Sequence, residues 1–168
     1  MSGYSIWLTL EKDSRSSYRN LIIKLSKRFK SSSFEPHCTI YGRLDINLDD
    51  IKAVITDLVT TRNQFSTTVK TLKSGNSQWK SLYLSIKNNQ QMNFLHLQCK
   101  KKFGLSRKYA FDPHLSLAYG LYDPETIYIA TKNIIIPKYL AFSGIAIVKT
   151  GQNVTKWETV FQRQFGEG

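Results

Sequence analysis

The hexapeptide Phe-Glu-Pro-His-Cys-Thr at positions 34–39 is repeated as Phe-Asp-Pro-His-Leu-Ser at positions 111–116. Each copy places an aromatic residue, an acid and a proline before a histidine, and a hydroxyl residue two positions after it. The chain has three histidines, so two of them share one local setting, with one copy in each half. This pattern predicts a duplicated unit whose two copies face each other across a single site.

Strand periodicity gives the two histidines a common environment. In an extended segment residues two apart project to the same face, so His37 and Thr39 lie on one face and Cys38 on the other. The second copy pairs His114 with Ser116 in the same way. The alternate positions of both copies are apolar, which suits a core-facing side, and the proline before each histidine marks a strand start because it cannot donate to a ladder. We therefore expect both histidines near strand starts, on the polar face.

A pair of imidazoles suits the hydrolysis of a phosphodiester. With an ordinary pKa of about 6.5, one histidine can be neutral and accept a proton while the other is protonated and donates one. The reaction needs both, because the nucleophilic oxygen loses a proton as the leaving oxygen gains one. Thr39 and Ser116 would donate hydrogen bonds to the non-bridging phosphoryl oxygens, where negative charge must be held. His37 and His114 are therefore the catalytic candidates.

The chain around each motif follows the same order of predicted elements: strand, amphipathic helix, loop, histidine strand. In the first half a strand at 4–10 precedes a helix whose apolar stripe spans 18–29. In the second half a strand at 81–86 precedes a helix with an apolar stripe over 92–103. We predict an α+β fold with pseudo-twofold symmetry, in which two lobes of antiparallel sheet line a central cleft and helices lie outside.

Further elements connect and close these halves. Asn47 can cap a helix over the residues that follow it, and 65–72 returns as a strand. Asp123, followed by proline, is a typical helix start, although the isoleucine-rich segment behind it could be partly extended. Strands at 143–149 and 157–161, around a Thr-Gly-Gln-Asn turn, close the chain.

The two H-x-[TS] motifs resemble the signature of the two-histidine phosphoesterase superfamily. Segments 4–8, 79–84, 113–119 and 155–160 resemble the plant and yeast cyclic phosphodiesterase branch, so the resemblance spans nearly the whole chain. It implies a hydrolase that uses no metal or other cofactor. It also implies small cyclic phosphates as substrates, namely 2′,3′-cyclic nucleotides or ADP-ribose 1″,2″-cyclic phosphate, the latter a by-product of tRNA splicing.

Carried over to this chain, the resemblance makes His114 the base that activates water and His37 the acid at the leaving oxygen. Thr39 and Ser116 then bind the phosphate. Tyr119 stands where that branch has a tyrosine near the phosphate. Its odd offset from His114 would send it to the far face of a simple strand, so its placement requires a bulge or a turn nearby.

The three tryptophans have different expected roles. Trp7 and Trp157 alternate with apolar neighbours in predicted strands, so we interpret them as core or lobe-packing residues. Trp79 follows a Ser-Gly-Asn-Ser loop, where an aromatic residue at the rim of the cleft could stack on a nucleobase; ordinary packing is the equal alternative. His96 lies inside the second helix without a matching partner and is interpreted as an ordinary helix residue.

Glu35 and Asp112 precede the histidines by two residues and could orient them or bind a metal ion. We favour polar residues at strand starts, because a metal site needs more ligands than two histidines with distant carboxylates. Plant members of the resembling branch carry additional cysteines that can pair. Cys38 and Cys99 do not show that pattern, so we expect no regulatory disulfide.

At 168 residues and 41% hydrophobic, the chain can bury a good core as one two-lobed domain over residues 1–168. It has no apolar run of membrane-spanning length and no secretory signal pattern. We therefore expect a monomer of the cytosol or nucleus with no membrane partner. The net charge of +12 would attract a small phosphorylated substrate and could also mean that RNA is a partner.

Basic residues gather ahead of both histidine motifs. The two groups are Lys24, Lys27, Arg28 and Lys30, and Lys100, Lys101, Lys102, Arg107 and Lys108. They either steer substrate or complement the negative ends of helix dipoles, and both interpretations stay open. Three functions remain: hydrolysis of small cyclic phosphates, which we favour; action on RNA ends with a 2′,3′-cyclic phosphate or on cyclic oligonucleotides; and a non-catalytic RNA-binding module, for which duplicated histidines would be unnecessary.

Overall fold

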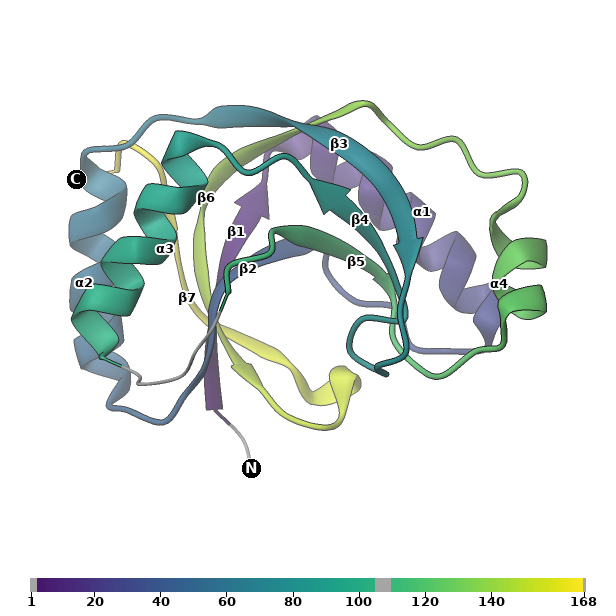
Figure 1. Cartoon of the computed structure of the whole chain (residues 1–168). Coiled ribbons are helices and arrows are strands. Elements are labelled where there is room, and N and C mark those ends of the chain that lie inside the picture. Colours follow the sequence, from purple (N-terminus) through teal and green to yellow (C-terminus); the bar gives the residue numbers. More distant parts are fainter. Residues whose placement is uncertain (1–2, 105–109, 168) are drawn as a thin grey trace.

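The computed structural model describes residues 3–104 and 110–167 (Figure 1). Its helices are α1 (Lys12–Phe29), α2 (Leu48–Thr60), α3 (Gln90–Phe103) and α4 (Pro124–Thr131). Its strands are β1 (Gly3–Leu10), β2 (His37–Leu44), β3 (Phe65–Ser74), β4 (Leu82–Ile86), β5 (His114–Ala118), β6 (Tyr139–Thr150) and β7 (Glu158–Gln164). The predicted α+β class and the repeated order of strand, helix and histidine strand are confirmed.

The strands form one antiparallel sheet in the order β1-β2-β5-β4-β3-β6-β7, with an additional pairing of β1 with β6. The long strand β6 makes this closure possible: one edge pairs along β1, and the other edge is divided between β3 and β7. The two halves meet at a second seam, where Cys38 of β2 pairs with Leu115 of β5. The sheets predicted for the two lobes are therefore continuous with each other (Figure 1).

Helices α1 and α3 lie outside the sheet, and each packs on the histidine strand of the other repeat. Helix α1 contacts β5, the histidine strand of the second repeat, and α3 contacts β2, the histidine strand of the first. In α3 the buried His96 ring forms a hydrogen bond through Nδ1 with the Ile40 carbonyl at 3.0 Å and stacks on Phe111 with centroids 4.5 Å apart. His96 is thus a packing residue between helix and strand, and each histidine strand is backed by the helix of the opposite repeat.

Local sequence explains where the helices begin and end. Asn47 accepts a hydrogen bond from Asp49 N at the start of α2, and Asp123 caps α4 in front of its first-turn proline, as predicted. Gly104 ends α3 in the left-handed conformation that glycine adopts at low cost. Near the C-terminus the closing strands are longer than predicted, and a short 3-10 helix, Val154–Lys156, precedes β7. Within residues 3–104 and 110–167, no helix is both long and apolar enough to cross a membrane.

The main core lies between the helices and one face of the sheet. Cys38 and Leu115, the middle residues of the two motifs, are fully buried there. The strand alternation predicted from the sequence then leaves the histidines and hydroxyl residues on the opposite face. The structure therefore separates a packed side, which fixes both motif strands, from a polar side that can accept a ligand.

Candidate active site

The two motifs are related by local twofold symmetry at the seam between β2 and β5. Each strand begins at its histidine, directly after the proline, and Cys38 pairs with Leu115 at the centre. In an antiparallel ladder this register sets His37 across from Ser116 and Thr39 across from His114. The structure thus brings the four predicted motif residues together on one face of two adjacent strands.

The backbone holds both histidine rings in the same way. Nδ1 of His37 lies 2.7 Å from the Glu35 carbonyl oxygen, and Nδ1 of His114 lies 2.7 Å from the Asp112 carbonyl oxygen. A carbonyl oxygen can only accept, so each Nδ1 carries a hydrogen and donates it. In the neutral tautomer Nε2 then holds a free lone pair, and in the imidazolium it holds a transferable proton. Each histidine can therefore act as a base or as an acid through Nε2.

Glu35 and Asp112 contact the histidine rings through their backbone carbonyl groups, not through their carboxylates. The carboxylates of Glu35 and Asp112 instead form ion pairs, with Arg15 of α1 and with Lys80 respectively. The hydrogen bond from Lys80, aided by its charge, lowers the pKa of Asp112. Polarity at the strand start, the interpretation favoured from the sequence, describes the side chains but misses the two carbonyl bonds that orient the rings.

His37 is buried among aromatic rings. Its imidazole lies flat on the Trp7 indole, with centroids 3.5 Å apart and planes 7° from parallel. Phe34 and Trp157 approach it edge-on at 6.2 Å and 6.3 Å. Burial lowers the pKa of His37 to about 4, with a further lowering from His114 and an opposing effect of the Glu35 carbonyl. His37 is therefore neutral in the free protein near pH 7.

His114 lies in a more open and more polar setting. Its ring meets Tyr83 of β4 edge-on, with centroids 5.5 Å apart. Burial lowers the pKa of His114, and the Asp112 carbonyl opposes this. The positive charge of Lys80 lowers the pKa further, and the negative charge of the Asp112 carboxylate raises it. The two histidines thus share a backbone pose and differ in their neighbours.

Tyr119 reaches the motif residues because the chain leaves the strand before it. Strand β5 ends at Ala118, and Gly120 has a φ of 139°, so the turn that the odd offset required is present. The Tyr119 side chain forms a hydrogen bond with Ser116, and burial raises the pKa of Tyr119 to about 12. The phenol therefore keeps its proton near pH 7 and can act as a donor beside Ser116.

Trp79 belongs to an aromatic cluster formed by Trp7, Phe34, Trp79, Tyr119 and Trp157. Trp79 stacks on Trp157 at 6.1 Å and meets Tyr119 at 5.7 Å, so the β3–β4 connection and the β6–β7 connection touch (Figure 1). The expected packing role of Trp7 and Trp157 is incomplete, since Trp7 also stacks on His37. The alternation of residues along the strand could have revealed this role. In β1, Trp7 shares the polar face with Ser5 and Thr9, whereas the alternate residues enter the main core.

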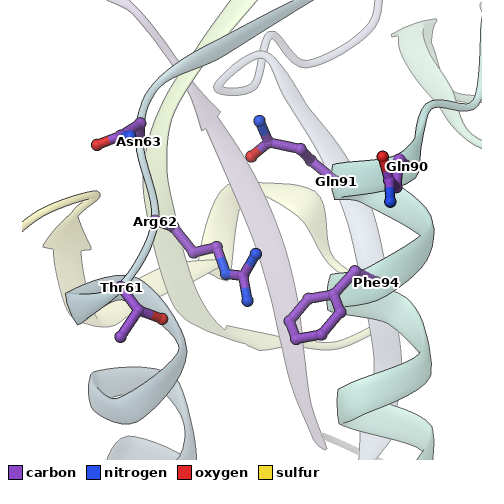
Figure 2. Close-up of a pocket in the computed structure, with 6 residues that line it drawn as sticks. All are labelled: Thr61, Arg62, Asn63, Gln90, Gln91 and Phe94. Atoms are coloured by element: carbon purple, nitrogen blue, oxygen red, sulfur yellow. The ribbon is translucent and has the colours of Figure 1, made fainter.

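A cavity of about 510 Å³ opens beside His37, within the size range of small-ligand sites. It is lined by Trp7, Thr9 and His37, by the amide side chains of Gln64, Gln162 and Gln164, and by further residues including Lys12 and Arg15. A smaller cavity of about 320 Å³ lies between the end of α2 and the start of α3, around Arg62 and Phe94 (Figure 2). None of the predicted site residues lines this second cavity.

The described residues give this face no cluster of metal ligands and no exposed thiol. Among the residues that the structure describes, no three or more His, Cys, Asp and Glu side chains are grouped to hold a metal ion. Cys38 and Cys99 are both free and buried, and burial raises the pKa of each thiol to about 12. Lys100, Lys101 and Lys102 occupy the last turn of α3, whereas Arg107 and Lys108 lie outside the described residues.

Comparisons with known proteins match most of the chain. A family model described as "Cyclic phosphodiesterase-like protein" matches residues 1–134, which include both motifs. A cyclic phosphodiesterase from Arabidopsis thaliana is 23% identical over 117 residues, a match that covers 70% of this chain and 65%, just under two thirds, of the relative.

Two solved structures share the fold over almost the whole chain. Escherichia coli LigT complexed with 3′-AMP is 13% identical, with a TM-score of 0.63 and coverage of 99% of each chain. A Thermus thermophilus protein is 13% identical, with a TM-score of 0.66 and coverage of 99% of this chain and 98% of its own.

Proposed function

The chain belongs to the cyclic phosphodiesterase-like family of the two-histidine phosphoesterase superfamily, and from this premise we propose that it hydrolyses small cyclic phosphodiesters. The proposed substrates are 2′,3′-cyclic nucleotides and ADP-ribose 1″,2″-cyclic phosphate. The products are ring-opened phosphomonoesters. The Arabidopsis relative named as a cyclic phosphodiesterase and the LigT structure with bound 3′-AMP support this substrate class.

One observation carries the proposal: both H-x-[TS] motifs present the same set of groups from adjacent strands. Each Nδ1 is anchored on a carbonyl oxygen at 2.7 Å, which reserves each Nε2 for proton transfer. The register at Cys38 and Leu115 sets a hydroxyl residue across from each histidine. An RNA-binding module has no need of two rings locked in one tautomer.

In the proposed mechanism His114 accepts a proton from water through Nε2, and the water oxygen forms a bond to phosphorus. The bond from phosphorus to the ring oxygen breaks, and that oxygen takes the proton from Nε2 of His37. Thr39 and Ser116 donate hydrogen bonds to the non-bridging oxygens. One proton is gained and one is lost, so the histidines exchange protonation states and solvent restores them.

His37 must acquire its proton as the substrate binds. Its pKa of about 4 leaves it neutral in the free protein near pH 7. A phosphate anion placed against His37 favours the imidazolium, because an opposite charge within about 4–6 Å raises the pKa of a histidine. Binding of the substrate therefore also produces the protonated His37 that the reaction needs as its acid.

We place the nucleoside part of the substrate in the cavity beside His37. Its glutamine side chains offer both donors and acceptors for a base or a ribose. Trp79, at the junction of the two loops, does not line this cavity and offers an alternative surface on which a base could stack outside it. The net charge of +12 would speed the arrival of such an anion in low salt.

A second candidate is the processing of RNA ends with a 2′,3′-cyclic phosphate. The observation that favours it is the exposed run Lys100, Lys101 and Lys102 at the end of α3. A surface that follows an RNA backbone makes affinity fall steeply with salt, whereas a pocket for one cyclic phosphate engages few charges. We favour the small substrate. We also propose that the protein acts as a monomer in the cytosol or nucleus.

A substrate panel tests the proposal. The purified chain should convert a mononucleoside 2′,3′-cyclic phosphate or ADP-ribose 1″,2″-cyclic phosphate to the monoester, at an unchanged rate after exhaustive chelation. An oligoribonucleotide with the same cyclic end should be no better a substrate. Absence of turnover with every cyclic phosphate would reject the function, and activity lost to the chelator and restored by a divalent ion would reject the mechanism.

A further inference from the structure

Each histidine has one neighbour that the other lacks. His37 has an indole against its face, and His114 has an ammonium group close by. Because the two motifs match in backbone, register and Nδ1 bonding, these neighbours are where the acid and base roles can diverge.

Trp7 acts on His37 in two opposing ways: it shares in the burial that lowers the pKa of His37, and its π face attracts the charged form of the ring more than an aliphatic neighbour would. A cation over the face of an indole is attracted by the ring quadrupole, and tryptophan is the strongest of the aromatic partners. The contact is fixed, since Trp7 is 5% exposed, lies across from Thr39 and Ala146 in the sheet and meets Trp157 at 5.6 Å. An imidazolium at His37 would form this interaction fully, and a neutral ring would not.

Lys80 is placed to favour the neutral form of His114. Its ammonium group pairs with Asp112, two residues before His114, and lies 4.6 Å from the centre of the Tyr83 ring that borders His114. A second positive charge at His114 is disfavoured by this cation. The same residue therefore anchors the carbonyl-bearing loop and opposes protonation of the ring.

We propose that Trp7 and Lys80 are positioning residues that assign the two roles: Trp7 stabilises His37 as the imidazolium acid, and Lys80 keeps His114 as the neutral base. The assignment rests on the proposed function. It predicts that an anion entering between the two histidines raises the pKa of His37 more than that of His114.

The other charged groups near the rings are paired, are common to both rings or line the adjoining cavity. Around His37 they are the Glu35 carboxylate, paired with Arg15, and His114 itself; Glu11 and Lys12 line the adjoining cavity. Around His114 they are Asp112, paired with Lys80, and His37, with Lys73 acting on Asp112. Two differences remain: the indole against His37, and the charge of Lys80, which acts on His114, whereas Arg15 is not among the groups that shift the pKa of His37.

The test is a titration of both imidazoles by NMR, with and without sulfate, a tetrahedral anion whose charge is constant over the range used. In the wild type sulfate should raise the pKa of His37 more than that of His114. In Trp7→Leu the pKa of His37 with sulfate should be lower by about 0.5 to 1.5 pH units. Trp7→Phe, which keeps a ring in the site, should show a smaller decrease and serves if Trp7→Leu does not fold.

The lysine arm has matched controls. Lys80→Met should raise the pKa of His114, both by removing a cation and by freeing the Asp112 carboxylate, whereas Lys80→Arg should leave it near the wild-type value. Lys132→Met removes the same charge from the exposed C-cap position after α4 and should change neither histidine.

An unchanged His37 titration in the Trp7 variants, or an unchanged His114 titration in Lys80→Met, would overturn the assignment. These titrations need no turnover. A failure of the proposed function would appear instead in the substrate panel.

Discussion

His37 and His114 hold the same pose in different surroundings. Both donate from Nδ1 to the carbonyl two residues earlier, but His37 is enclosed by Trp7, Phe34 and Trp157, whereas His114 is partly exposed beside Tyr83 and Lys80. The shared pose comes from the repeated hexapeptide. Most of the differences come from residues outside it, on β1, on β4 and the loop before it, and before β7, while Phe34 faces His37 and its counterpart Phe111 stacks on His96. Duplication therefore supplies the geometry, and mainly unrepeated residues supply the asymmetry.

The largest effect should come from removing either ring. His37→Ala and His114→Ala should each lower kcat/KM for a 2′,3′-cyclic nucleotide by about 10²- to 10⁴-fold, because each removes one proton transfer. Steady-state kinetics measures this. The asparagine variants, which retain a side-chain donor near the Nδ1 position, should lose as much; near-normal activity in any of the four would show that the ring in question does not transfer a proton.

The next largest effect should come from removing the hydroxyl groups, which tests the geometry that the two motifs share. Thr39→Ala and Ser116→Ala should each lower kcat by about 10²- to 10³-fold, since each removes a donor to the developing charge on phosphorus oxygens. Thr39→Ser keeps the hydroxyl and should stay close to wild type. A loss confined to one of the two alanine variants would mean that the twofold arrangement of donors is not used symmetrically.

The loss of stability at low pH tests the second part of the comparison, the different surroundings of the two histidines. The pKa of His37 falls from 6.5 to about 4 on folding, so the unfolded chain binds this proton more readily and stability is lost as pH falls from 6.5 toward 4. By linkage the loss between pH 7 and pH 5 is about 2 kcal/mol.

Urea unfolding at the two pH values, compared between wild type and His37→Gln, isolates this contribution. The variant should lose less stability on acidification than the wild type by that amount. His114→Gln should reduce the loss of stability between pH 7 and pH 5 by a smaller amount, because His114 is more exposed. Equal pH dependence in wild type and His37→Gln would mean that His37 is not held neutral.

A smaller effect is expected from the basic run on α3. Replacing Lys100, Lys101 and Lys102 with alanine should lower kcat/KM for a mononucleotide by less than tenfold, or about 1.4 kcal/mol, because the run lies outside the motifs. The same variant assayed on an oligoribonucleotide with a cyclic end is the control. A hundredfold preference for the oligonucleotide in wild type, abolished by the substitution, would shift the function to RNA end processing.

Sequence alone predicted what depends on local pattern. The period of two placed His37 and Thr39 opposite the buried Cys38, and the side chain of Asp123 caps a helix as its position before proline indicated. What it missed depends on partners distant in the chain. The closure of one sheet through β6, the stack of Trp7 on His37 and the pairing of Lys80 with Asp112 are set by register and tertiary packing, which no local period encodes.

The central claim, that His37 and His114 act in a single step, is tested most directly by the double-mutant cycle on kcat/KM for a 2′,3′-cyclic nucleotide. If both rings serve one concerted transfer, the double alanine variant should be little slower than either single variant, because removing one ring already disables the step. Losses that multiply in the double variant would contradict the account and assign the two histidines to independent contributions.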